Sequence, residues 1–210
     1  SGAFLALSPG ARKVWEIFVD RRGRRFMQED HPSIDYRERS LLRQPGNAMF
    51  IVLDQAILEN AAPITVEPAA KYRARFGRHP AFVKAKTLAE LARVLGVPVA
   101  NLRRTVTDYN AAVDGRYDRK FGRHFLIRKI VKPPFYAIRA QGLTVVSPAG
   151  LRVDRKLRVL RGDGKPIRNL FAAGEVLGFG RTSGNAFVGG LSLTPALAFG
   201  RLLGESLLEW

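Results

Sequence analysis

A glycine-rich stretch near the end of the chain has the residue types needed to bind a flat or anionic group. It runs from Gly174 to Gly190 and includes Glu175, Arg181 and Asn185. Glycine lets backbone amides approach a ligand closely. A helix expected from Thr194 would add free N–H groups and the positive end of its dipole, which suits a group that becomes negative during a reaction. A structural turn packed against a sheet is the alternative explanation of the same glycines.

Other catalytic and metal-binding motifs are absent from the sequence. The chain has no cysteine, and its three histidines, His31, His79 and His124, lie far apart. This excludes a disulfide scaffold and cysteine-ligated metals, and it predicts no metal site. The sequence also has no G-x-S-x-G elbow and no P-loop. Charged residues interrupt every apolar run, so no transmembrane helix is expected.

The middle of the chain predicts a pair of helices. Thr87 and Glu90 form a capping box, and Gly96 ends the helix that they begin. Pro98 opens a second helix, because its missing N–H costs nothing at that position. An apolar stripe then extends to about Gly115, so the two segments predict a compact helical hairpin.

Strands are predicted on both sides of this hairpin. Residues 15–20 indicate a strand that enters a tight turn at Gly23, with 24–27 returning as its partner, and 48–54 indicate a buried strand. Residues 31–45 show no clear period. Later short strands are expected at 143–146, 151–154, 157–160 and 169–173, with turns at 148–150 and 161–164.

The charge balance favours anionic partners. The chain holds 35 Lys and Arg against 18 Asp and Glu, a net charge of +17. Nucleic acid, phosphate-bearing cofactors and carboxylate substrates all fit this excess. The densest basic groups are residues 21–25 and 116–132. A solvated face explains such runs equally well, and a basic nucleic-acid or polyanion-binding module remains an alternative function.

Five segments in order resemble the FAD-dependent fumarate reductase and 3-ketosteroid 1-dehydrogenase superfamily. They are residues 17–29, which resemble a G-x-R-F-x-N-E element with Gln28 in place of Asn, the helix pair 87–122, the strands 134–137 and 150–154, and the closing segment 169–201. The resemblance covers nearly the whole chain. It implies FAD as cofactor and hydride transfer between flavin N5 and a carbon next to a carbonyl or carboxylate.

The resemblance also implies roles for individual residues. Glu175 would accept a hydrogen bond from the flavin ribityl chain. Arg181 would clamp a substrate carboxylate, and Tyr136 would polarise a substrate carbonyl. An enoate and a 3-keto compound are therefore both candidate substrates. The implied cofactor contacts come from Gly174, Glu175, Gly184, Asn185, Ala186, Phe187, Leu191, Ser192, Leu193 and Thr194.

The implied fold is α+β in two parts. Residues 1–132 would form part of a substrate-capping domain, and 133–210 the C-terminal strands and terminal helix of a Rossmann-like FAD-binding domain. No G-x-G-x-x-G follows a strand, so the N-terminal βαβ unit is missing from this sequence. We therefore expect a cytoplasmic fragment of a longer flavoenzyme that is inactive without its nucleotide-binding portion. A non-catalytic partner subunit is a further alternative.

Overall fold

The computed structural model describes residues 13–64, 68–142, 147–183 and 190–208. The chain divides into two compact units, residues 1–142 and 143–210. The first unit is built around a four-stranded sheet, and the second around a two-stranded one. Both sheets are antiparallel. The fold is thus of the mixed α and β class that the sequence predicts.

The large sheet has the strand order β1-β2-β4-β3. Its strands are β1 (Ile17–Val19), β2 (Ala48–Asp54), β4 (Phe135–Gln141) and β3 (Phe82–Ala85). Ile51 of β2 lies opposite Phe18 on one side and Ile138 on the other. All three side chains are buried. The continuous apolar run of β2 therefore marks a strand covered on both faces, as expected from its sequence.

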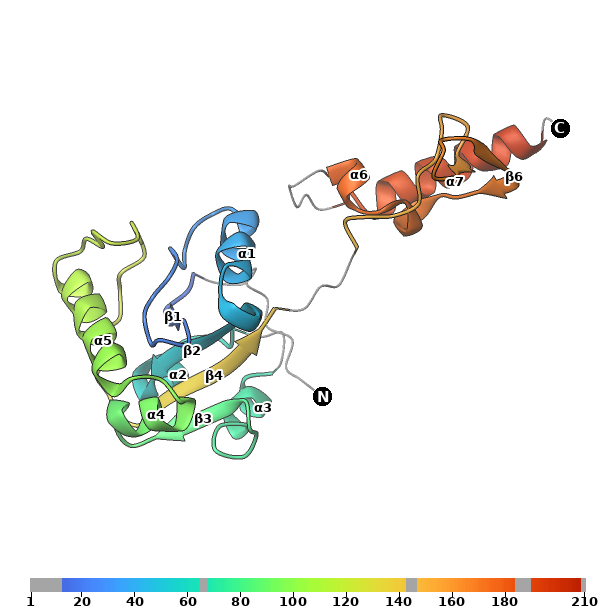
Figure 1. Cartoon of the computed structure of the whole chain (residues 1–210). Helices are drawn as coiled ribbons and strands as arrows, with labels where there is room; N and C mark the ends of the chain where they lie inside the picture. Colours follow the sequence, from blue (N-terminus) through green and yellow to red (C-terminus); the bar gives the residue numbers. More distant parts are fainter. Residues whose placement is uncertain (1–12, 65–67, 143–146, 184–189, 209–210) are drawn as a thin grey trace. The chain divides into compact units, whose positions relative to one another are not determined.

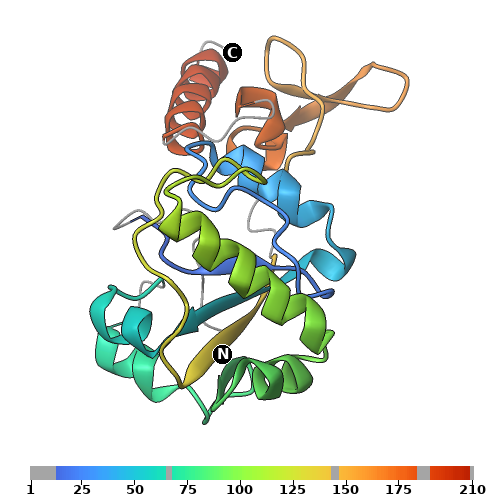
Figure 2. The same cartoon turned by 90° about the vertical axis from the view of Figure 1, so that its left-hand side faces the viewer.

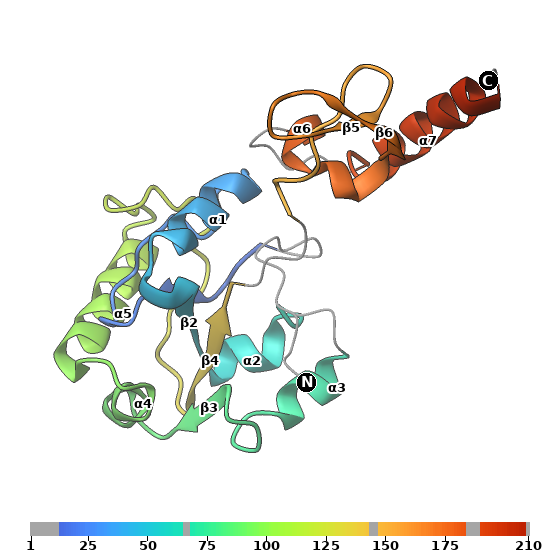
Figure 3. The ribbon, with the colours of Figure 1, turned by 45° about the vertical axis from the view of Figure 1, so that its right-hand side comes forward.

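Helices cover both faces of this sheet. The first unit contains α1 (Ile34–Leu42), the 3-10 helix η1 (Pro45–Asn47), α2 (Gln55–Asn60), α3 (Ala69–Ala74), α4 (Leu88–Leu95) and α5 (Val99–Asp114). Helices α4 and α5 lie on one side, with α2 and α3 on the other (Figure 3). Figure 2 shows α5 running across the sheet. The core of the unit lies between these layers.

The predicted helical hairpin is confirmed. Thr87 caps α4 by accepting a hydrogen bond from the Glu90 backbone N–H at 3.1 Å, and the Glu90 carboxylate accepts one from Lys86 N at 2.9 Å. Gly96 ends α4 in the left-handed region at φ 73°. The sequence-based interpretation therefore has a direct physical basis, because each cap satisfies a backbone amide that the helix leaves without a partner.

One local prediction was wrong, and one helix had no predicted counterpart. Residues 24–27 form no strand and make only an isolated bridge between Val19 and Arg25, while β1 pairs with β2 instead. The reason is that Arg25 points into a buried cluster of charges described below. Residues 31–45, which showed no clear period, contain α1, whose first turn is capped by Ser33 through a 3.3 Å bond from Tyr36 N.

The second unit has a small core next to its hairpin. It contains β5 (Arg158–Leu160), β6 (Pro166–Phe171), the 3-10 helix η2 (Gly174–Leu177), α6 (Gly180–Ser183) and α7 (Leu193–Leu208). Figure 1 shows α7 beside the hairpin. Its Phe199 packs against Val159, Ala172 and Leu177. Helix α7 begins one residue before Thr194.

The remaining strand predictions have mixed outcomes. Residues 151–154 form only a bridge between Val153 and Val159, and 143–146 lie outside the described residues. The compact units divide after Gly142, because β4 pairs with both β2 and β3 of the first unit. The assignment of the two segments to a capping domain and a flavin domain stays a prediction.

Candidate functional site

Tyr136 lies in β4, in the middle of the large sheet. Its side chain is only 4% exposed, and its ring meets that of Phe76 edge to face at 4.9 Å between centroids. The phenol O–H donates to Oε1 of Gln55. Burial and the nearby charge of Glu59 raise the pKa of Tyr136 above its ordinary value, so the phenol remains a proton donor at neutral pH.

Gln55 connects this buried phenol to a surface carboxylate. It is the first residue of α2, and its Nε2 donates to Glu59 Oε1 at 2.6 Å. Lys132 Nζ lies 3.3 Å from the other oxygen of the same carboxylate. The hydrogen bond from Gln55, and after it the one from Lys132, lower the pKa of the Glu59 carboxyl group. The Gln55 amide is thus held from one side and accepts from the phenol on the other, which fixes the orientation of both groups.

Asp54 holds the elements that carry this chain of contacts. It is completely buried at the end of β2. Its Oδ1 accepts from Ile57 N at 2.9 Å, which caps α2, and its Oδ2 accepts from Val131 N and Lys132 N at 2.9 and 2.8 Å. The segment that leads into β4 is therefore fixed to the start of α2. Sequence reasoning missed both Asp54 and Gln55, although an Asp that ends a buried strand before a helix is a recognisable cap signal.

The G-x-R-F-x-Q-E stretch forms a buried ionic cluster. Arg25 makes a two-pronged contact with Glu29, from Nε at 2.7 Å and from Nη2 at 2.6 Å, and Nη2 also reaches Asp118 at 2.7 Å. Arg123 Nη1 lies 3.6 Å from Glu29 and donates to the Glu16 carbonyl at 2.6 Å. Two segments of the resemblance, 17–29 and 87–122, therefore meet here. The contact between Arg25 and Asp118 thus joins two segments of the first unit that are far apart in the sequence.

The cluster also perturbs the ionisation of its members. Burial by itself would raise the pKa of Asp118, but the hydrogen bond and charge of Arg25 outweigh it and hold the pKa below the ordinary value. The pKa of Arg25 is raised in turn, because Glu29 and Asp118 outweigh the effect of its own burial. Both groups stay charged at neutral pH, and each neutralises the other.

In the second unit, the described residues among the predicted cofactor contacts lie at the start of η2 and around the start of α7. Gly174 opens η2 at φ 80°, and a Cβ placed on it would lie 3.8 Å from the Ala196 Cβ in the first turn of α7. A Cβ placed on Gly190 would lie 3.7 Å from Thr194 Oγ1, so both distances are ordinary van der Waals contacts among the described residues. The structure thus brings Gly174 together with the start of α7.

Side chains at this place are accessible. Glu175, Ser192, Leu193 and Thr194 are exposed and Leu191 is half-buried. Leu193 is 66% exposed. Val176, next to Glu175, and Leu197, one helical turn after Leu193, are also exposed apolar side chains. An open backbone, a helix start and an apolar surface together suit a flat group with one edge that gains negative charge. Gly184, Asn185, Ala186 and Phe187 lie outside the described residues.

Other glycines of the stretch serve the chain itself. Residues 147–151 run against 176–180, with Phe179 N donating to Ser147 O at 2.9 Å and Leu151 N to Val176 O at 2.8 Å. A Cβ on Gly150 would lie 2.2 Å from Gly178 N, and one on Gly178 would lie 2.6 Å from Ala149 C. Gly150 and Gly178 are thus needed where two backbone segments pass close together. At these two positions the glycines have a structural role, which was the alternative to ligand binding in the sequence analysis.

Arg181 lies in the short helix α6 and its side chain is exposed. Its backbone N–H donates to Gly178 O at 3.1 Å, so the guanidinium projects from the segment that the backbone crossing fixes. Tyr136 and Arg181 belong to different units.

Among the described residues, no cluster of His, Asp and Glu could hold a metal ion, and no described helix has the length and apolarity required to span a membrane.

Comparison with known proteins identifies the class. Residues 8–193 match the FAD binding domain family, and the chain belongs to that family. FAD is the cofactor of this family. The uncrowded Gly174, the exposed Glu175 and the first turn of α7 are compatible with a bound flavin. These residues are the described ones among those that the resemblance implied, and their roles and contacts with the cofactor stay predictions.

Three relatives are more specific. The chain is 35% identical over 190 residues to NADH:acrylate oxidoreductase of Vibrio harveyi, which covers 90% of this chain and 18% of that protein. It is 29% identical over 220 residues to 3-oxosteroid 1-dehydrogenase of Mycobacterium tuberculosis, an alignment that covers 93% of this chain and 38% of that protein. The open conformation of a flavocytochrome c3 fumarate reductase superposes with a TM-score of 0.66 at 29% identity, covering 92% and 32%. The chain thus spans 18–38% of the length of these three proteins.

Proposed function

We propose that the chain is part of an FAD-dependent oxidoreductase that acts on a carbon–carbon bond next to a carbonyl or carboxylate. The observation that carries this proposal is the family match over residues 8–193. The three relatives are named for acrylate, a 3-oxosteroid and fumarate. Each of these molecules has a carboxylate or ketone that can activate a neighbouring carbon–carbon bond.

The second unit would hold the flavin. When bound, FAD would supply N5 as the atom that accepts or releases a hydride. Gly174 and Gly190 would let the backbone approach the ring, Glu175 would accept a hydrogen bond from the ribityl chain, and residues 191–194 would place the start of α7 against the ring. The positive end of the 16-residue helix α7 would favour negative charge at the ring edge.

Two residues of the chain could polarise the substrate. Arg181 has the exposed guanidinium that a substrate carboxylate requires for two parallel hydrogen bonds. Tyr136 has a protonated phenol, which suits a ketone oxygen. A phenol has a single proton to donate, so Tyr136 would have to exchange its bond to Gln55 for one to the substrate. Arg181 thus favours an enoate substrate and Tyr136 a 3-keto compound.

The test uses the protein purified at its native length. We expect the released cofactor to be identified as FAD by chromatography and mass spectrometry. We also expect turnover either of acrylate or fumarate with a reduced viologen dye, or of a 3-oxosteroid with an oxidising dye. Protein that is folded by circular dichroism but contains no flavin, and turns over none of these compounds, would refute the proposal.

A further inference from the structure

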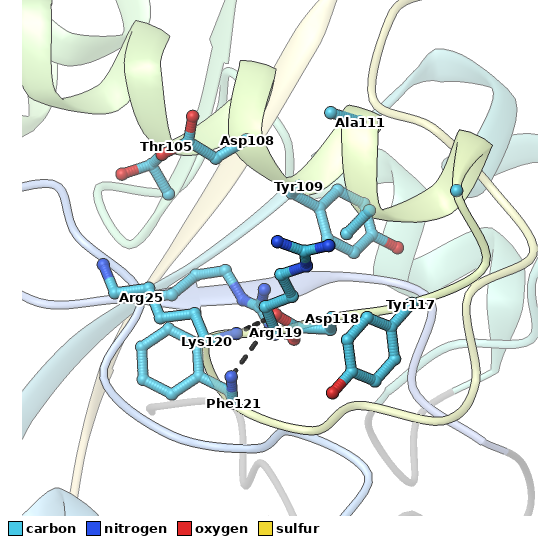
Figure 4. A pocket seen from close by; sticks show the side chains of 12 residues that line it. Arg25, Thr105, Asp108, Tyr109, Ala111, Tyr117, Asp118, Arg119, Lys120 and Phe121 are labelled. Atoms are coloured by element: carbon cyan, nitrogen blue, oxygen red, sulfur yellow. Dashed lines mark hydrogen bonds and ion pairs between the residues drawn. The ribbon is translucent and has the colours of Figure 1, made fainter.

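A cavity of about 530 Å³ opens between α5 and the loop that follows it. We call it the α5 pocket. Figure 4 shows Thr105, Asp108, Tyr109 and Ala111 contributed by the helix, and Tyr117, Arg119, Lys120 and Phe121 contributed by the loop. Ala111 and Ala112 of the helix and Gly115 just after it also line the cavity, and these small residues leave the space open. The volume lies within the range of pockets that bind small organic molecules.

The loop side of the α5 pocket is held in place by the buried ionic cluster. Arg25 binds Asp118 at 2.7 Å, and Asp118 Oδ1 accepts from Lys120 N at 3.2 Å and from Phe121 N at 3.3 Å. The guanidinium carbon of Arg25 also lies 5.5 Å from the centre of the Tyr109 ring and 4.9 Å from that of Phe121. The pocket is therefore formed before any ligand arrives, which lowers the entropy cost of binding.

The charge of the α5 pocket is not balanced within it. Glu29 and Asp118 neutralise Arg25. Arg119 and Lys120 are exposed and make no ion pair among the described residues, and Figure 4 shows both side chains at the pocket. The remaining acid, Asp108, lies 3.9 Å from Arg104. Two adjacent cations are thus left to attract an anion of about two charges, which is the charge of a phosphate monoester at neutral pH.

The aromatic side chains define the rest of the ligand. Tyr117 is 66% exposed, and Phe121 lines the same side of the cavity. Phe121 is half-buried, and Lys120 Nζ lies 5.3 Å from the centre of its ring. An exposed aromatic side chain beside two cations suits the stacking of a planar base together with the binding of its phosphate. We propose that the α5 pocket binds a nucleoside monophosphate, with the base against Tyr117 and Phe121 and the phosphate on Arg119 and Lys120.

Calorimetric titration of the full chain with three probes tests this proposal. The probes are inosine 5′-monophosphate, which has both groups, inosine, which lacks the phosphate, and ribose 5-phosphate, which lacks the base. FAD also contains a nucleoside monophosphate, so the variants described next, which lie in the α5 pocket, distinguish this binding from binding at the predicted flavin site. We expect the monophosphate to bind at least tenfold more tightly than either fragment. Equal binding of inosine and its monophosphate would overturn the phosphate contact.

Paired variants locate the binding. Arg119→Ala with Lys120→Ala should weaken binding of the monophosphate at least tenfold, and Tyr117→Ala should weaken it several-fold. The matched control, Arg78→Ala with Lys84→Ala, removes the same charge from two exposed residues outside the pocket and should leave the affinity within twofold. All replaced side chains are exposed, so the variants should unfold at the temperature of the unmodified chain. An equal loss in the control pair would show diffuse charge attraction and overturn the proposal.

Discussion

The phenol O–H of Tyr136 donates to Oε1 of Gln55, a residue 81 positions earlier in the chain. The sheet register creates this contact. Tyr136 lies opposite Leu53, and β2 passes into α2 only two residues after Leu53. Because Asp54 caps α2 at the turn between them, Gln55 begins the helix directly beside the neighbouring strand. Strand pairing and helix capping together position one side-chain contact.

Replacement of Gln55 should therefore test how strongly this contact stabilises the first unit. Gln55→Leu leaves the buried phenol without its acceptor and should lower the free energy of unfolding by about 1–3 kcal/mol. Tyr136→Phe removes the hydroxyl itself and should cost less, because the amide of Gln55 keeps its contact with Glu59. Urea denaturation of both single variants and the double variant measures the coupling. Simple additivity of the two costs would contradict the contact.

Substrate choice should separate the roles of Arg181 and Tyr136. If the substrate is an enoate, Arg181→Gln should raise its KM by about 10- to 100-fold, which corresponds to the loss of a charged hydrogen bond. If it is a 3-keto compound, Tyr136→Phe should lower kcat by about 100-fold or more. Steady-state kinetics of both variants on both substrate classes checks this. An unchanged rate constant and KM in both variants would remove both residues from the site.

Glu175 should affect flavin content. Glu175→Ala removes the acceptor that we assign to the ribityl chain and should weaken FAD binding by about tenfold, the cost of one hydrogen bond. Glu205→Ala is a suitable control, since Glu205 is an exposed acid of the same unit whose contact is with Arg201 on α7. The flavin-to-protein ratio after gel filtration is the measurement. An equal ratio in the two variants would show that Glu175 has no such role.

The ionic cluster of the first unit should make stability depend on pH. The pKa of Asp118 is below its ordinary value of 3.8 in the folded chain. As the pH falls, Asp118 therefore becomes protonated in the unfolded chain at a higher pH than in the folded chain. The stabilisation is complete above the ordinary value and is lost as the pH falls through the lower, folded pKa.

Asp118→Asn should thus lower the free energy of unfolding by about 1.5–3 kcal/mol at neutral pH. The difference from the unmodified chain should shrink in acid. Asp114→Asn is the control, because its ion pair with Lys129 is exposed and should contribute about 1 kcal/mol or less. Denaturant titrations at several pH values measure both. A difference that is independent of pH would contradict a charged Asp118 in the cluster.

The backbone crossing of the second unit should not tolerate a side chain at Gly178. This residue has φ 84°, and a Cβ would lie 2.6 Å from two backbone atoms. Gly178→Ala should therefore destabilise the unit by more than the roughly 1–3 kcal/mol expected of a sparsely populated backbone conformation alone. Gly162→Ala is the control, since nothing lies within 4 Å of its added Cβ. Limited proteolysis should cleave the second unit of the Gly178 variant faster. Equal cleavage rates would contradict the crossing.

Local signals in the sequence predicted the elements that local physics determines. The caps at Thr87 and Gly96 and the apolar run of 48–54 each depend on near neighbours, and all three are confirmed. The strand predicted at residues 24–27 failed because Arg25 is buried in a cluster with Glu29 and with Asp118, a residue far along the chain. No local period shows such a contact. The helix α1 was missed because its cap, Ser33, precedes a segment rich in charges.

The candidate site could be predicted only in part for the same reason. The resemblance indicated Gly174, Glu175 and the start of α7, and the structure brings the described members of that set together. It did not indicate Gln55, because the contact with Tyr136 depends on strand register and on a helix start set by Asp54. Nor could the glycines that serve the backbone crossing be separated from those that stay open. That distinction needs the distances between the two segments.

The order of the strands has a consequence for synthesis of the chain. Helices α4 and α5 are consecutive and contact each other, so this hairpin can form as soon as residue 115 has left the ribosome. Strand β4, by contrast, joins β2 to β3 and is the last of the four to be made. Until residue 141 emerges, β2 and β3 expose unpaired edges. A nascent chain stalled before that point should recruit chaperones or aggregate, and one released after it should not.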